Sequence, residues 1–273
     1  MLRKLLGRRQ PAPIDAERWQ RLTAGWPFLD HLDEGQHQRL KALCEQFLAR
    51  KAINGAEGLP IDDDVRLAIA VQACLPALRI GLGPYDDFVE IVVYPERFIA
   101  PRRLVDDAGV VHEFSDELAG EAMDGGPIVL SWPDADPSAG QAGYNVVIHE
   151  FAHKLDLADG EPDGVPPLPA ALRPRWRQAV DEAYEKFCAA LDEVESRIPH
   201  DIDPESPEAD GYFARLPLDP YAATDPSEFF AVAAEVFFTD PAPLAAAFPV
   251  LYRLLADFFG QDPMAPISGS PQK

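Results

Sequence analysis

The segment NVVIHEFAHKLDLADG, residues 145–160, constrains the fold more than any other stretch of the chain. At about 100° per residue, the apolar side chains in and just before it gather within about 100° of one another on one side of a helix. These side chains are Tyr144, Val147, Ile148, Phe151 and Leu155. The spacing therefore predicts an amphipathic helix with this side against a hydrophobic core.

Two histidines, His149 and His153, stand one turn apart on the opposite side, with Glu150 about 60° to 100° further round. Imidazoles at this spacing can both reach one Zn²⁺, and the adjacent carboxylate is then directed at a water on the metal. Zinc lowers the pKa of that water to about 7, and the carboxylate takes its proton as the water attacks a carbonyl. The pattern predicts His149 and His153 as zinc ligands and Glu150 as the general base.

The alternative is a surface helix with two solvent-facing histidines. Because the chain has only 6 histidines, a chance H-E-x-x-H match has an expectation on the order of one per cent. We therefore favour a zinc site, with one ion per chain.

A catalytic zinc needs a third protein ligand. The other histidines, His31, His37, His112 and His200, stand alone, and no spacing singles one out. The segment YAATDPSEFFAVAAEVFF predicts a helix on which Glu228 and Glu235 lie within about 20° of each other. Glu228 also fits the third position of a capping box that begins at Asp225. The residue pattern alone leaves open whether Glu228 or Glu235 is the ligand.

The order of elements indicates an α+β fold. Apolar periodicity is helical up to about residue 82, and the segments FVEIVVYPERFI and GPIVLSW then predict strands. A long amphipathic helix, an acidic proline-containing connection and further helices follow the H-E-x-x-H segment. We expect a basic tail over residues 1–10, a helical N-terminal subdomain over 11–84, a core with C-terminal helices over 85–262, and a polar tail over 263–273.

Composition limits the partners. There are 46 acidic against 24 basic residues, and the formal charge of −22 disfavours direct contact with nucleic acid phosphates. The most apolar long stretch, residues 65–83, is interrupted by charged residues and a proline, so we expect no membrane span. The 3 cysteines are widely separated, which argues against a disulfide framework. Together with the lack of a signal peptide pattern, these features predict a cytoplasmic protein.

Four separated motifs, HEFAHKLD, DPYAATDPSEFFAVAAEVFF, EIVVYPERFIAP and GPIVLSW, resemble the Mlc titration factor A family of bacterial zinc peptidases. The likeness runs over roughly residues 40–263. It implies a zincin-like metallopeptidase core, with an H-E-x-x-H helix, a small β-sheet and a second ligand-bearing helix. It also implies that His149, His153 and the glutamate after Asp-Pro-x, Glu228, hold the zinc, and it thus favours Glu228 over Glu235.

The family's catalytic core is similar to that of the anthrax lethal factor protease, in which a tyrosine seven residues before the glutamate ligand faces the zinc. Tyr221 has that position here, and its phenol would donate a hydrogen bond to the oxyanion of the tetrahedral intermediate; the alternative is a buried loop tyrosine. Glu235 and Asp156 are expected to accept the N–H of a ligand histidine, or else to be solvated carboxylates. The strand GPIVLSW is expected to be a sheet edge that pairs with an extended peptide.

The resemblance implies an aminopeptidase acting on short peptides, and a partner of the Mlc type, a sugar-responsive transcriptional repressor. Two hypotheses follow. The first is a cytoplasmic zinc peptidase that uses Glu150, and the second is a regulatory binding protein whose zinc site is mainly structural. They differ at Glu150, because a structural site has no use for a base. A weaker third hypothesis is hydrolysis of a non-peptide amide.

Overall fold

The computed structural model describes residues 10–105, 111–122, 125–139, 142–204 and 206–265. The predicted tails lie outside these residues, except for residue 10 and residues 263–265. The helices are α1 (Ala16–Thr23), α2 (Glu34–Arg50), α3 (Asp63–Cys74), α4 (Trp132–Ala135), α5 (Val146–Asp156), α6 (Arg173–Glu195), α7 (Asp210–Phe213), α8 (Pro226–Thr239), α9 (Pro241–Ala247) and α10 (Pro249–Phe259). The strands are β1 (Ala52–Gly55), β2 (Glu90–Tyr94), β3 (Phe98–Val105), β4 (Val111–Leu118), β5 (Gly120–Ala122) and β6 (Ile128–Ser131). The predicted α+β class is confirmed.

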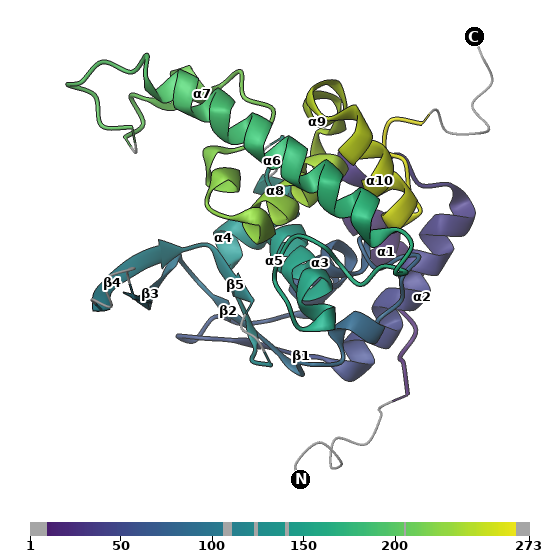
Figure 1. The fold of residues 1–273 in the computed structure, drawn as a ribbon. Coiled ribbons are helices and arrows are strands. Elements are labelled where there is room, and N and C mark those ends of the chain that lie inside the picture. Colours follow the sequence, from purple (N-terminus) through teal and green to yellow (C-terminus); the bar gives the residue numbers. More distant parts are fainter. Residues whose placement is uncertain (1–9, 106–110, 123–124, 140–141, 205, 266–273) are drawn as a thin grey trace.

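A four-stranded sheet has the order β1-β2-β6-β5. The first three strands are parallel, and β5 runs antiparallel to β6 along one edge. The strands β3 and β4 form a separate antiparallel pair that projects from the body of the protein (Figure 1). The parallel pair β1 and β2 requires a crossover connection, which α3 supplies.

The expectation that GPIVLSW forms a sheet edge is wrong. Its strand, β6, lies between β2 and β5, and the residues Ile128–Ser131 are all buried. A short continuous apolar run of this kind is typical of a strand covered on both faces. The short strand β5 takes the edge instead.

The helix α5 is the centre of the fold. It contacts β5 and β6 on one side and α8 on another (Figure 1). Its predicted apolar face is buried, and the ring of Phe151 lies 5.7 Å from that of Phe47, 4.9 Å from that of Tyr85 and 5.9 Å from that of Phe88. Burying a side chain of this size stabilises the fold by about 1.5–3 kcal/mol. This packing holds α5 firmly between the sheet and the other helices.

The helix α8 begins where its sequence predicts. The carboxylate of Asp225 accepts hydrogen bonds from the backbone N–H groups of Ser227 and Glu228, and Pro226 occupies the first turn, where it costs no hydrogen bond. Phe230 on this helix packs edge-on against Trp176 of α6, with ring centroids 6.2 Å apart. The start of α8 is thereby fixed beside α5.

The N-terminal region shares the core of the rest of the chain. Its helices contribute buried side chains such as Leu40 and Ile69 to the same cluster as Phe151, and β1 extends the sheet. Helical periodicity missed β1, which is only 4 residues long. The boundary of the predicted subdomain at residue 84 stays a prediction. In the part of the chain that the structure describes, no helix combines the length and the apolar character needed to cross a membrane.

Candidate metal centre

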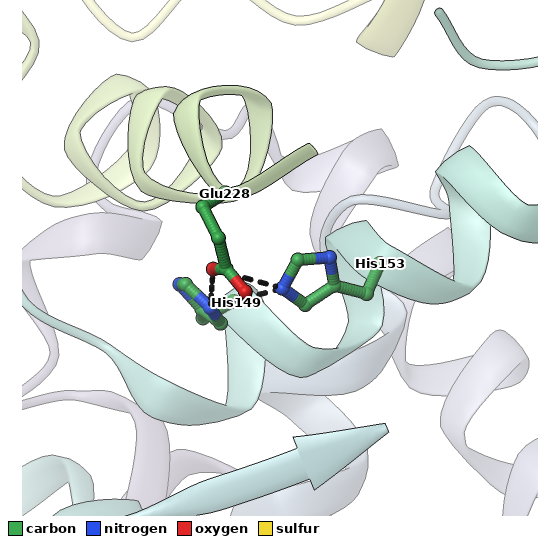
Figure 2. Close-up of side chains that lie close together, drawn as sticks. All are labelled: His149, His153 and Glu228. Carbon is green, nitrogen blue, oxygen red and sulfur yellow. Dashed lines mark hydrogen bonds and ion pairs between the residues drawn. The ribbon is translucent and has the colours of Figure 1, made fainter. Parts of the chain in front are cut away.

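Three side chains from two helices converge on one point. His149 and His153 of α5 meet Glu228 of α8, as Figure 2 shows. The Nε2 atoms of the two histidines lie 3.1 Å apart, and Glu228 Oε2 lies 3.1 Å from the first and 3.2 Å from the second. Among the described residues, this is the only group of three or more histidine, cysteine or acidic side chains placed to share a metal ion.

The donor set fits zinc. Tetrahedral zinc with nitrogen and oxygen ligands at about 2.0–2.1 Å places its donor atoms about 3.3–3.4 Å apart. The three donor atoms lie 3.1–3.2 Å from one another, so small side-chain adjustments would suffice to accommodate the ion. Two imidazoles and one carboxylate are also a ligand set that catalytic zinc uses, with a fourth position left open.

His149 is anchored on its far side by Glu235. The Nδ1 atom of His149 lies 3.2 Å from Glu235 Oε2, and Glu235 Oε1 accepts a hydrogen bond of 2.8 Å from the backbone N–H of Asn145, the N-cap of α5. Burial alone would lower the pKa of His149, but the carboxylates of Glu235 and Glu228 outweigh it and hold the pKa well above its usual value. Glu235 therefore lies where an acceptor of the His149 N–H belongs, outside the group of three.

His153 is anchored differently, through a hydroxyl that the sequence analysis missed. Its Nδ1 atom lies 3.2 Å from Ser227 Oγ, which donates a hydrogen bond of 2.7 Å to Asp156 Oδ2. The same Asp156 oxygen accepts from the backbone N–H of Gly164 at 3.0 Å. Burial raises the pKa of Asp156 to about 6, against the lowering effect of these two hydrogen bonds. Asp156 thus reaches His153 only through Ser227.

Glu228 points its carboxylate at the histidines. Asp225 caps α8, but the Glu228 carboxylate is directed at His149, His153 and the phenol of Tyr221. Burial tends to raise the pKa of Glu228, yet its hydrogen bonds to the two imidazoles hold it well below the usual range. The capping box, as an account of the Glu228 side chain, does not fit this geometry.

Tyr221 lies beside the group, on the short 3₁₀ helix η6 (Pro220–Ala223). Its hydroxyl is 3.3 Å from Glu228 Oε1, and its ring centroid is 6.1 Å from that of His149. The residue is 48% exposed, so the alternative of a buried loop tyrosine is excluded. Tyr221 is placed where it can face a substrate that enters from solvent.

Glu150 follows His149 on α5 and is only 4% exposed. Burial raises the pKa of Glu150 to about 7, although the neighbouring histidines lower it. The side chain lies against the edge strand β5, since Glu150 Oε1 is the nearest atom to the space where a Gly120 side chain would stand. A buried carboxylate at a sheet edge, beside two possible metal ligands, suits proton transfer.

The other histidines lie apart from this group. His31 Nε2 contacts Gln261 Oε1 at 3.2 Å, His37 lies on α2, and His200 is exposed beyond the end of α6. Among the residues that the structure describes, the metal-binding group consists of His149, His153 and Glu228 alone. The side chain of His112 lies outside those that the structure describes.

Comparison with known proteins supports a metallopeptidase. Residues 2–260 match the family described as glucose-regulated metallo-peptidase M90. Mlc titration factor A of Pectobacterium atrosepticum is 38% identical over 257 residues, which cover 94% of this chain and 90% of that protein. The proteins of the same name from Serratia proteamaculans and Escherichia fergusonii are 37% and 35% identical, over 94% and 90% of this chain and over 91% and 86% of their own lengths. The family resemblance seen in the sequence is confirmed.

Proposed function

The chain belongs to the glucose-regulated metallo-peptidase M90 family, and from this membership we propose that it is a zinc-dependent peptidase that removes residues from the amino end of short peptides. The observation that carries the proposal is the convergence of His149, His153 and Glu228 on one point. Glu150 lies one residue from the first of these, buried at the sheet edge. This arrangement supports the proposal of a metal site with a base beside it.

We assign His149, His153 and Glu228 as the zinc ligands. Zinc bound there would polarise the substrate carbonyl and lower the pKa of the attacking water to about 7. Glu150 takes the proton from that water and passes it to the leaving amine, a role that needs a carboxylate but no bond to the metal. Tyr221, whose hydroxyl lies 3.3 Å from Glu228, donates a hydrogen bond to the oxyanion as it forms.

The substrate peptide binds along β5. This strand is the edge of the sheet next to α5, and an extended peptide can add to an exposed edge through main-chain hydrogen bonds. The peptide carbonyl that is attacked would then lie between β5 and the His149, Glu150 and His153 side chains of α5. The same geometry would also serve hydrolysis of a non-peptide amide, so the substrate panel must include one.

The test is metal removal and restoration. The native chain is stripped of metal with a chelator and reloaded with zinc, and hydrolysis of an L-alanine anilide, a panel of short peptides and a non-peptide amide is followed. We expect activity on the free-amine substrates that is lost on stripping and restored by one zinc ion per chain. Equal hydrolysis of acetylated peptides would contradict the aminopeptidase assignment, and activity that is independent of metal would contradict the zinc site.

A second function is favoured by the name of the relatives, Mlc titration factor A. We propose that the chain also binds a sugar-responsive transcriptional repressor of the Mlc type, in the cytoplasm. Co-elution of the chain with such a repressor in gel filtration is the measurement. Binding by a chain that holds zinc but hydrolyses nothing would make this the main function, with a structural metal site. Separate elution of the two proteins would refute it.

A further inference from the structure

Gly120, the first residue of β5, leaves no room for a side chain. A Cβ atom built on it would lie 2.4 Å from Glu150 Oε1, 2.8 Å from Glu150 Cγ and 2.7 Å from Val146 Cγ2. Ordinary van der Waals contacts between such atoms begin at about 3.5 Å, so these approaches are strongly repulsive. The space beside Gly120 is therefore filled by the carboxylate and stem of Glu150 and by a methyl group of Val146.

The backbones on both sides of this contact are fixed. Gly120 is paired with Leu130, and the carbonyl of the preceding Ala119 accepts a hydrogen bond of 2.7 Å from Ser131 N. On the other side, α5 is anchored in the core by Phe151. When neither backbone can withdraw, a new methyl group at position 120 displaces the part that moves most easily, which is the flexible Glu150 side chain.

Gly55 and Gly25 differ from Gly120 in what an added Cβ atom would meet. A Cβ at Gly55, on the opposite edge of the sheet, would meet the backbone carbonyl of Leu59, which cannot rotate away. A Cβ at Gly25 would meet nothing within 4 Å. At Gly120 the nearest atom is a carboxylate oxygen of Glu150.

We propose that Gly120 is a positioning residue that sets where the Glu150 carboxylate lies. The absence of a side chain on the edge strand lets the carboxylate occupy the space between β5 and the metal ligands, next to the strand along which the substrate is proposed to lie. The inference rests on the proposed function, because it assumes that Glu150 is the base. It adds that the edge strand fixes this base by contact.

The experiment compares Gly120→Ala with the native chain and with Gly25→Ala, the open-space control. Each protein is loaded with zinc, and zinc content, melting temperature, kcat and KM are measured with a short peptide. We expect full zinc content and a fall in kcat of about 10- to 100-fold in Gly120→Ala, with KM within twofold of native, since a base displaced by about 1 Å loses reactivity without loss of substrate binding. Gly25→Ala should match the native chain.

A second pair of variants separates positioning from packing. Truncation of Glu150 removes two of the three short approaches and leaves only the one with Val146 Cγ2. If Glu150 causes part of the clash, Gly120→Ala should therefore lower the melting temperature less in a Glu150→Ala background than in the native one. Native kcat in zinc-loaded Gly120→Ala would overturn the inference. So would loss of zinc, or an equal loss of melting temperature in both backgrounds. If the native zinc-loaded chain cleaves nothing, the proposed function fails instead, and the melting temperatures still decide whether Gly120 holds Glu150 in place.

Discussion

Removal of the Ser227 hydroxyl tests how the site holds His153. When Nε2 of His153 serves as a ligand, its Nδ1 is protonated and donates a hydrogen bond to Ser227 Oγ, 3.2 Å away. The Ser227 hydroxyl in turn donates a hydrogen bond of 2.7 Å to Asp156 Oδ2. In Ser227→Ala the Nδ1–H of the partly buried His153 loses its partner, and Asp156 Oδ2 keeps only the backbone N–H of Gly164. The variant therefore removes the link between the histidine and the carboxylate and leaves both in place.

The expected loss of zinc affinity follows from the two hydrogen bonds that Ser227 Oγ makes. Leaving a buried donor unsatisfied costs about 1–3 kcal/mol, and at about 1.4 kcal/mol for each factor of ten this corresponds to zinc binding weakened about 5- to 150-fold. Loss of such outer partners of metal ligands typically weakens metal binding about 10- to 100-fold, which agrees. Asp156→Ala should weaken zinc binding by a similar factor. The double variant should be little worse than either single one, because both residues act through one chain of hydrogen bonds.

Zinc affinity is measured by competition with a chromogenic chelator. The matched control is Ser196→Ala, since Ser196 is exposed at the end of α6 and its hydroxyl donates to the backbone carbonyl of Glu193. Native affinity in the control, with a 10- to 100-fold loss in Ser227→Ala, supports the account. An affinity of Ser227→Ala within twofold of native would refute the reasoning, as would fully additive losses in the double variant.

Three further predictions concern single side chains. Glu228→Gln should weaken zinc binding by more than the roughly 10- to 100-fold expected for Glu235→Gln, and the reverse order in chelator competition would exchange their roles. Tyr221→Phe should keep full zinc content and lower kcat by about 10²- to 10³-fold, whereas an unchanged kcat would remove the phenol from the mechanism. Lys51 is 8% exposed, and burial lowers its pKa from 10.5 to about 8. Between about pH 8 and pH 10.5, Lys51 is protonated in the unfolded chain but has lost its proton in the folded one, so stability rises with pH. The free energy of unfolding of the native chain, measured in urea, should therefore rise by about 2–3 kcal/mol from pH 7 to pH 10 relative to Lys51→Met. A parallel pH dependence in the two proteins would contradict the lowered pKa.

Local spacing predicted the elements that carry the site. The apolar face of α5 and the start of α8 at Asp225 follow from residues within a few positions of one another, and the structure places both as expected. The strand order could not be found in this way, because the pairing of β6 with β5 and β2 depends on the whole sheet. The short strand β5, of 3 residues, carries too little pattern to be recognised. The edge of the sheet was therefore assigned to the wrong strand.

The candidate site, like the fold, could be predicted only where local spacing determines it. One turn of helix fixes the relation of His149 to His153, but Glu228 and Glu235 share a helix face, so their different contacts depend on how α8 is packed against α5. Ser227 was missed because the second position of a capped helix is an ordinary place for serine. Its contact with Asp156 joins residues 71 positions apart, and no local pattern records such a contact.

The most direct test of the central claim compares zinc content and peptide hydrolysis in the native chain and in Glu150→Gln. This change keeps the shape of the side chain and removes its ability to take a proton. The account predicts one zinc ion per chain in both proteins and hydrolysis of the L-alanine anilide and short peptides by the native chain alone. Equal hydrolysis by both would show that Glu150 is not the base, and zinc without hydrolysis in either would make the chain a metal-containing binding protein.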